Sequence, residues 1–185
     1  MYIDSHAHLE MDPFDEDRTA VIERASADGI EAILAVGTNL VSSRAAIALA
    51  QRHPQLYPTA GFHPHDAAGV TQDMWLEIEE LLQRPDVIAA GEMGLDYFKR
   101  YSPLDEQRQV FRRQLRLAQA VGKPAIIHCR NAGDDVLAIL REEHAEQCGG
   151  VMHCFSGDLA LAEACLDLGL YISFAGPITF RNAEE

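Results

Sequence analysis

Short runs of apolar residues alternate along the chain with longer stretches in which apolar residues recur at helical spacing. The runs have strand length and predict about seven β-strands, at residues 2–6, 31–36, 56–62, 87–92, 124–129, 150–155 and 170–174. The stretches between them predict helices at residues 15–27, 42–52, 73–83, 103–121, 132–146 and 159–168. Ser102 and Pro103 are typical of a helix start, and Gly122 of a helix stop.

Regular alternation of strands and helices predicts an α/β fold with a parallel sheet. An open doubly wound sheet and a TIM (β/α)8 barrel share this pattern, but polar residues follow many successive strands, and a barrel collects such strand ends on one rim. A complete barrel needs eight strands and typically about 250 residues. We therefore expect an incomplete barrel of about seven βα units, with its final strand missing and residues 179–185 starting a helix.

Composition, the length of the apolar runs and the N-terminus predict the domain organisation and the cellular compartment. With 48 % hydrophobic and 24 % charged residues and no repeat or linker-like segment, residues 1–185 are expected to form a single globular domain. The longest apolar runs are far shorter than the roughly 20 residues of a membrane span. The N-terminus lacks the basic and apolar regions of a signal peptide, so we expect a cytoplasmic protein without a membrane partner.

The charge of the chain restricts how it would bind nucleic acid. Fifteen Lys and Arg residues against 29 Asp and Glu residues give a formal net charge of −14. This balance excludes a broad basic surface for nucleic acid. DNA or another phosphodiester would have to bind at a local site, where metal cations are one source of positive charge.

Candidate metal ligands lie at or near the ends of four predicted strands. His6 and His8 are two residues apart, so both imidazoles lie on one face of an extended chain and can bind the same ion. Glu92 ends an apolar run, where a buried carboxylate is costly without a cation or hydrogen-bond donors. His128 and His153 end two later runs. Any of these residues alone is more typical of a structural role, but together they favour a metal site.

A second group is a candidate for substrate binding. His63 and His65 flank Pro64, which disturbs strand alternation, so we interpret both as substrate contacts rather than metal ligands. His63 is a candidate donor to a phosphate oxygen or a leaving group. Arg130 follows His128 closely and has the fork geometry that grips a phosphate, although a surface salt bridge is an equally common role.

Six short motifs together resemble the TatD family of metal-dependent hydrolases. They occur in order from Met1 to about Asn182: residues 4–8 (DSHAH), 61–65 (GFHPH), 91–97 (GEMGLDY), 127–130 (IHCR), 153–157 (HCFSG) and 173–176 (SFAG). The resemblance implies a TIM barrel of the metal-dependent hydrolase type, two divalent metal ions and deoxyribonuclease activity. It further implies that His6 and His8 bind one ion, that Glu92 bridges as the catalytic carboxylate, and that His128 and His153 bind the other.

The resemblance also implies a chemistry, in which two metal ions activate water to hydrolyse a phosphodiester. Imidazole ligands favour Zn or Mn over Mg alone. Family members continue into an eighth strand bearing an aspartate that this chain does not reach, so an inactive metal-binding remnant is one alternative. Hydrolysis of another ester or amide, such as a carboxylic ester on RNA, is the other.

Overall fold

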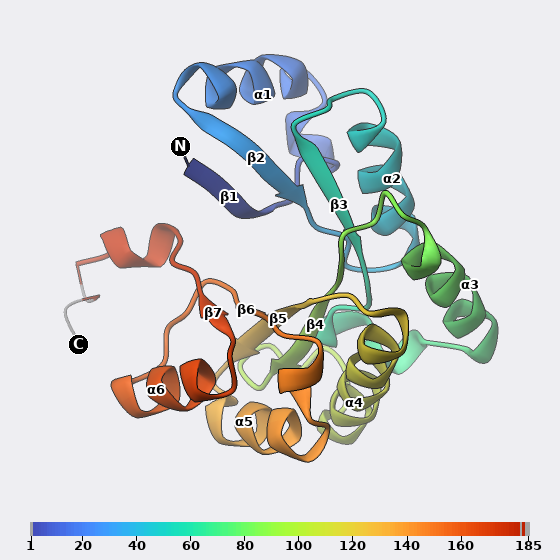
Figure 1. The fold of residues 1–185 in the computed structure, drawn as a ribbon, viewed down its shortest axis with the longest axis vertical. Helices are drawn as coiled ribbons and strands as arrows, with labels where there is room; N and C mark the ends of the chain where they lie inside the picture. Colours follow the sequence, from blue (N-terminus) through green and yellow to red (C-terminus); the bar gives the residue numbers. More distant parts are fainter. Residues whose placement is uncertain (1, 182, 184–185) are drawn as a thin grey trace.

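Seven parallel strands form a single curved sheet in the order β1-β2-β3-β4-β5-β6-β7, in a computed structural model that describes residues 2–181 and 183 (Figure 1). The strands are β1 (Tyr2–Ala7), β2 (Ile30–Ala35), β3 (Leu56–Ala60), β4 (Ala89–Asp96), β5 (Ala125–Arg130), β6 (Gly150–Met152) and β7 (Tyr171–Ile172). Within the described residues, β1 and β7 are the two edges of this sheet. The prediction of an incomplete TIM barrel with seven strands is confirmed.

Across the described part of the chain, six α-helices form an outer arc around the sheet (Figure 1). They are α1 (Arg18–Ala27), α2 (Leu40–Ala50), α3 (Gln72–Gln83), α4 (Leu104–Val121), α5 (Gly133–Glu142) and α6 (Leu159–Asp167). Short 3-10 turns lie at Asp12–Phe14, Pro64–Gly69, Ala145–Gln147 and Gly176–Thr179. None of the helices described is both long and apolar enough to span a membrane.

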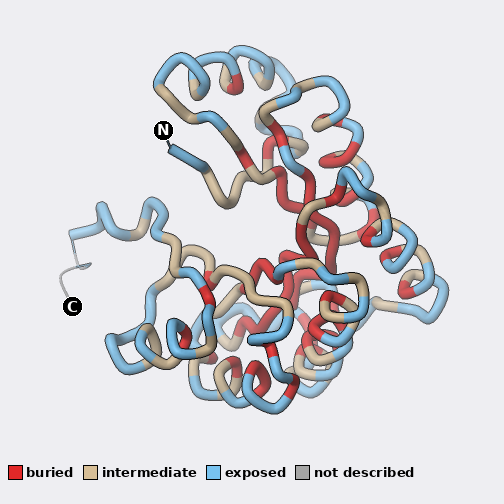
Figure 2. Tube along the Cα trace, viewed as in Figure 1, coloured by how far each residue is buried: buried red, intermediate tan, exposed pale blue. Residues whose placement is uncertain are grey.

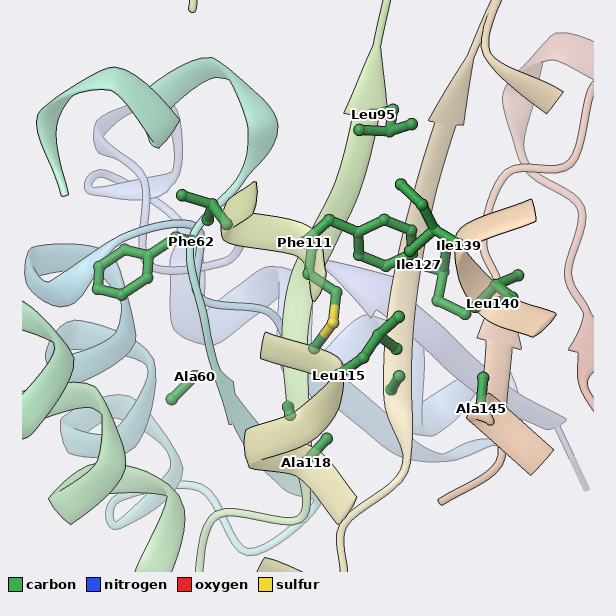
Figure 3. Packing of buried hydrophobic residues seen from close by; sticks show 14 of the residues in the cluster. Ala60, Phe62, Leu95, Phe111, Leu115, Ala118, Ile127, Ile139, Leu140 and Ala145 are labelled. Carbon is green, nitrogen blue, oxygen red and sulfur yellow. The ribbon is translucent and has the colours of Figure 1, made fainter. Parts of the chain in front are cut away.

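The main core lies between the middle strands and the helices that cover them, and the buried residues concentrate there (Figure 2). Phe111 and Leu115 of α4 are fully buried and pack in one cluster with Ile127 of β5 and Ile139 of α5 (Figure 3). A second, smaller cluster around Ile22 and Ile33 lies under α1. Burial of this kind is the main force that holds helices on a parallel sheet.

Several element boundaries differ from the sequence prediction. β4 continues to Asp96 instead of ending at Glu92, because all eight of its residues are buried and it keeps pairing with β5 up to Arg130. β6 and β7 are shorter than predicted. Ser102 does not cap α4; its hydroxyl donates to the carbonyl of His65 at 2.7 Å. Gly122 ends α4 in the left-handed conformation, as predicted.

The structure describes only part of the predicted final helix, residues 179–185. Gly176–Thr179 forms a short 3-10 turn and Phe180 is extended, so no α-helix begins at 179. The rest of that prediction lies outside the described residues, which end with 181 and 183.

Candidate metal centre

The predicted ligands converge at the carboxyl ends of the strands. His6 lies in β1, Glu92 in β4 and His128 in β5, whereas His8 and His153 follow β1 and β6 directly. All five line one cavity of about 1330 Å³. The structure therefore brings together residues that are up to 147 positions apart in the sequence, which is the convergence that parallel βα units produce at one rim.

Glu92 is the centre of this group. Only 3 % of the residue is exposed, and its two carboxylate oxygens face different histidines. Oε2 lies 3.2 Å from Nε2 of His6 and 3.5 Å from Nε2 of His8. Oε1 lies 2.8 Å from Nδ1 of His128 and 2.8 Å from Nε2 of His153. The carboxylate thus lies between two pairs of imidazoles, as a bridging ligand would.

Distances between the ring nitrogens fit shared metal ions. Nε2 of His6 and Nε2 of His8 are 3.1 Å apart, and Nε2 of His153 is 3.4 Å from Nδ1 of His128. Nitrogens bound about 2.0–2.1 Å from one tetrahedral ion lie roughly 3.3 Å apart. Nδ1 of His6 is buried without a hydrogen-bond partner.

His128 gives the most specific indication of a cation. Its Nε2 lies 3.3 Å from Oδ2 of Asp96, while its Nδ1 lies 2.8 Å from Oε1 of Glu92. A neutral imidazole has only one N–H, so it can donate to one of these two carboxylates and leaves its other nitrogen facing the second. A cation shared by that nitrogen and its carboxylate would satisfy the remaining contact, so the donor set fits a divalent metal.

The pKa values of the site residues shift in different directions, because burial and the neighbouring charges act on each residue differently. Burial disfavours the charged carboxylate of Glu92, but the surrounding imidazoles, His128 first, outweigh it and hold its pKa well below the usual range. Burial lowers the pKa of His6 and of His63 despite the nearby Glu92. Burial also opposes charge on His8, yet the Glu10 and Glu92 carboxylates raise its pKa to about 10.

His63 lies closer to the ligand group than its predicted substrate role implies. Its Nε2 is 3.5 Å from Oε1 of Glu92 and 3.3 Å from Nδ1 of His128. Two sets of donor atoms are compact enough for one ion each: His6, Glu92 and His153, and His63, Glu92 and His128. The geometry therefore adds His63 to the candidate ligands.

The other two predicted substrate contacts lie outside the ligand group. Nε2 of His65 donates to Oδ2 of Asp96 at 2.8 Å, and the side chain lines the cavity. Arg130 is exposed at the end of β5, and its guanidinium carbon lies 4.1 Å from the ring centre of Phe98. Both residues lie on the same rim as Glu92 but do not contact it.

Sequence reasoning missed two buried carboxylates. Asp96 is 1 % exposed and contacts both His65 and His128. The sequence signal for Asp96 is its position at the end of a run of mostly apolar and small residues, 89–96. Glu10 follows His8 by two positions, and its side chain is only 3 % exposed with both oxygens lacking a hydrogen bond. Oε1 of Glu10 lies 3.8 Å from Nδ1 of His8.

Glycines of β4 let the two central strands approach at the site. Gly94 pairs with His128 of β5 and has a φ of +141°. A Cβ at this position would lie 2.0 Å from the carbonyl oxygen of His128. Gly91, next to Glu92, would place a Cβ 2.5 Å from the carbonyl oxygen of Ile126. Glycine is required at both positions because the obstacle is backbone.

The chain is similar in sequence to known metal-dependent hydrolases and nucleases. A family model described as TatD related DNase matches residues 3–185. The uncharacterized metal-dependent hydrolase YabD of Bacillus subtilis is 44 % identical over 185 residues, which are all of this chain and 72 % of that protein. The 3'-5' ssDNA/RNA exonuclease TatD of Edwardsiella piscicida is 39 % identical over 175 residues, 94 % of this chain and 67 % of its own length.

A solved structure shares the fold. The TatD homologue YjjV from Escherichia coli superposes with a TM-score of 0.91 at 32 % sequence identity, covering 98 % of this chain and 71 % of that protein. A TatD family hydrolase from Entamoeba histolytica gives a TM-score of 0.85 at 27 % identity.

Proposed function

Because the chain belongs to the TatD-related DNase family of metal-dependent hydrolases, we propose that it hydrolyses phosphodiester bonds of nucleic acid at the site around Glu92. The observation that carries this proposal is the buried Glu92 carboxylate, whose two oxygens face separate groups of imidazoles. The named nuclease relatives support a nucleic-acid substrate.

We assign the ligands of two divalent ions from these contacts. His6 and His8 would hold one ion with Oε2 of Glu92, and His128 would hold the other with Oε1. His153 lies within reach of both His6 and His128, and we assign it to the second ion because its Nε2 is 2.8 Å from Oε1. His63 is a further ligand candidate on the Oε1 side. Such ions, when bound, polarise the phosphoryl group and lower the pKa of water. Imidazole-rich ligation favours Zn²⁺ or Mn²⁺ over Mg²⁺.

Residues of the chain then orient the site. Glu92 holds both groups of histidines at one carboxylate, and burial prevents water from screening it. Asp96 accepts from Nε2 of His65 and thereby fixes the orientation of the His65 ring at the wall of the cavity. Arg130 lies on the rim, where a guanidinium pairs with a phosphate outside the centre.

A comparison of two substitutions tests the function. Glu92→Gln keeps the size of the side chain but removes the charge between the two histidine groups. We expect hydrolysis of a labelled single-stranded DNA 12-mer to fall at least roughly 100-fold. Even mutation of residues that only hydrogen-bond to metal ligands lowers metal affinity or activity about 10- to 100-fold. Bound metal, measured by mass spectrometry after incubation with Mn²⁺ or Zn²⁺, should fall in parallel.

His144→Asn is the matched control. His144 is exposed, lies outside the cavity and has a φ of +54°, a conformation that Asn tolerates well. This variant should retain metal and activity. Retention of full activity by Glu92→Gln would contradict the proposal. If the unmodified chain binds metal and hydrolyses a carboxylic ester but not DNA, the site belongs to a hydrolase of carboxylic esters instead of a nuclease.

A further inference from the structure

Two exposed aromatic rings and two basic side chains lie together on the rim beside the candidate centre, and Arg100 is exposed in the same loop. Phe98 is 56 % exposed and Tyr101 is 66 % exposed, although aromatic residues usually lie in the core. Nζ of Lys99 lies 5.7 Å from the ring centre of Phe98 and 6.0 Å from that of Tyr101. The Arg130 guanidinium is 4.1 Å from Phe98. We call Phe98, Lys99, Arg100, Tyr101 and Arg130 the aromatic–basic platform.

The cations of the platform are not neutralised by carboxylates. Among the salt bridges of the described residues, none involves Lys99, Arg100 or Arg130. By contrast, Arg108 and Arg112 of α4 pair with acidic side chains of α5. In a chain with a net charge of −14, a group of three unpaired cations marks a local site for an anion.

The platform is continuous with the cavity. The ring centre of Tyr101 lies 4.7 Å from that of His65, in an edge-on contact. Tyr101 also lines the same cavity as Glu92 and His128. A chain of nucleotides that lies on the platform therefore has a short path to the proposed centre.

Hydrogen bonds hold the loop that carries the platform. Oδ1 of Asp96 accepts from the backbone N–H of Phe98 at 3.0 Å and from that of Lys99 at 2.8 Å. The Ser102 hydroxyl donates to the carbonyl of His65 at 2.7 Å and accepts from the N–H of Ala68 at 3.0 Å. A preorganised loop loses less entropy on binding, so its exposed rings are suited to a ligand.

We propose that the aromatic–basic platform binds single-stranded nucleic acid, with bases stacked on Phe98 and Tyr101 and phosphates beside Lys99, Arg100 and Arg130. Aromatic rings flanked by cations bind single strands with little sequence preference, because every base has a π-face. The bases of a duplex are already stacked and cannot reach these rings. The inference rests on the proposed function for its substrate class, and it identifies residues that select single strands for that centre.

The first experiment measures affinity without hydrolysis. The 185-residue chain with Mn²⁺ is titrated into two fluorescent phosphorothioate 12-mers, one of thymidine and one of abasic sugars, and anisotropy gives each Kd. Phe98→Ala should weaken binding of the thymidine oligomer about 5- to 160-fold, the effect of losing one stacked base. It should change binding of the abasic oligomer less than twofold. Phe98→Trp should restore the affinity for thymidine.

Control variants separate stacking from charge and from folding. Tyr171→Ala removes an aromatic side chain that is 77 % exposed on β7 and does not line the cavity, so both affinities should stay unchanged. Arg130→Ala should weaken both oligomers alike and lower the salt dependence of binding. Equal Kd values for Phe98→Ala and the unmodified chain on the thymidine oligomer would overturn the inference, as would an equal loss on both oligomers.

Hydrolysis is measured separately, so that the two proposals can fail separately. If the chain cleaves single-stranded DNA but Phe98→Ala and Tyr101→Ala leave KM unchanged, the platform is refuted and the proposed function stands. If the thymidine oligomer binds through Phe98 but no phosphodiester is cleaved, the platform stands and the proposed function is refuted.

Discussion

Gly94 shows how one residue controls the candidate centre. It pairs with His128, one of the proposed ligands, and its missing side chain leaves room for the His128 carbonyl. A side chain at position 94 would meet this carbonyl oxygen, which belongs to the backbone and cannot move without shifting His128 itself. A ligand contact thus depends on a residue that has no functional group.

We expect Gly94→Ala to destabilise the chain and to weaken metal binding. The new Cβ would meet the His128 carbonyl oxygen at 2.0 Å, and the φ of +141° adds strain, so the free energy of unfolding should fall by roughly 3 kcal/mol or more. Urea unfolding and metal content measure the two effects. Gly29→Ala is the control, because Gly29 also has a positive φ but has no atom within 4 Å of the added Cβ. Equal unfolding midpoints for the two variants would contradict this account.

At the scale of elements, α4 and α5 are joined by an ionic link as well as by the core. Glu143, at the end of α5, is buried and receives hydrogen bonds from Arg116 at 2.6 and 2.7 Å and from Arg112 at 3.0 Å. Hydrogen bonds from Arg116, and then from Arg112, outweigh burial and hold the pKa of Glu143 below its ordinary value.

This link predicts a specific pH dependence. A carboxylate whose pKa is lowered on folding stabilises the protein above its unfolded pKa of about 4.3, and the contribution is lost as pH falls through the lower folded value. Glu143→Gln should therefore reduce the melting temperature at pH 7, and the difference from the unmodified chain should shrink as pH falls below about 4.3. Glu80→Gln is the control, because Glu80 is exposed on α3 and forms no salt bridge within the described residues. A difference that stays constant from pH 7 to pH 3 would exclude the ionic explanation.

At the scale of the whole molecule, the candidate centre connects distant parts of the sheet. Its side chains come from β1 and β4, from β5 and from the segments after β3 and β6, which together span most of the strand order. An ion bound there would link the first strands directly to later ones. Binding of a metal should therefore stabilise the entire fold.

We expect Mn²⁺ or Zn²⁺ at about 100 times its dissociation constant to add about 2.7 kcal/mol to the free energy of unfolding. For a chain of this size, that corresponds to a rise of roughly 5–10 °C in melting temperature. Treatment with a chelator should reverse the rise, and Glu92→Gln should show a much smaller one. Identical melting curves with and without metal would argue against a shared centre.

Much of this organisation was readable from the sequence because it depends on local patterns. The apolar runs predicted all seven strands. The polar residues at or near the ends of those runs include His6, His8, His128 and His153, which the structure brings together. Glu92 was found as an acidic residue in a buried run. The predicted end of β4 was wrong, because Gly94 is typical of a loop although it lies within the buried strand.

The sequence by itself determined the order of strands and helices, their parallel arrangement and the kinds of ligand available, since side-chain periodicity and strand ends are local properties of the chain. Only the tertiary structure decided which oxygen of Glu92 faces which histidine, that His63 joins the ligand group, and that Asp96 connects His65, His128 and the loop of the aromatic–basic platform. These contacts depend on sheet curvature, strand register and the close approach at Gly94. Such features arise from the packing of distant segments, which no local pattern records.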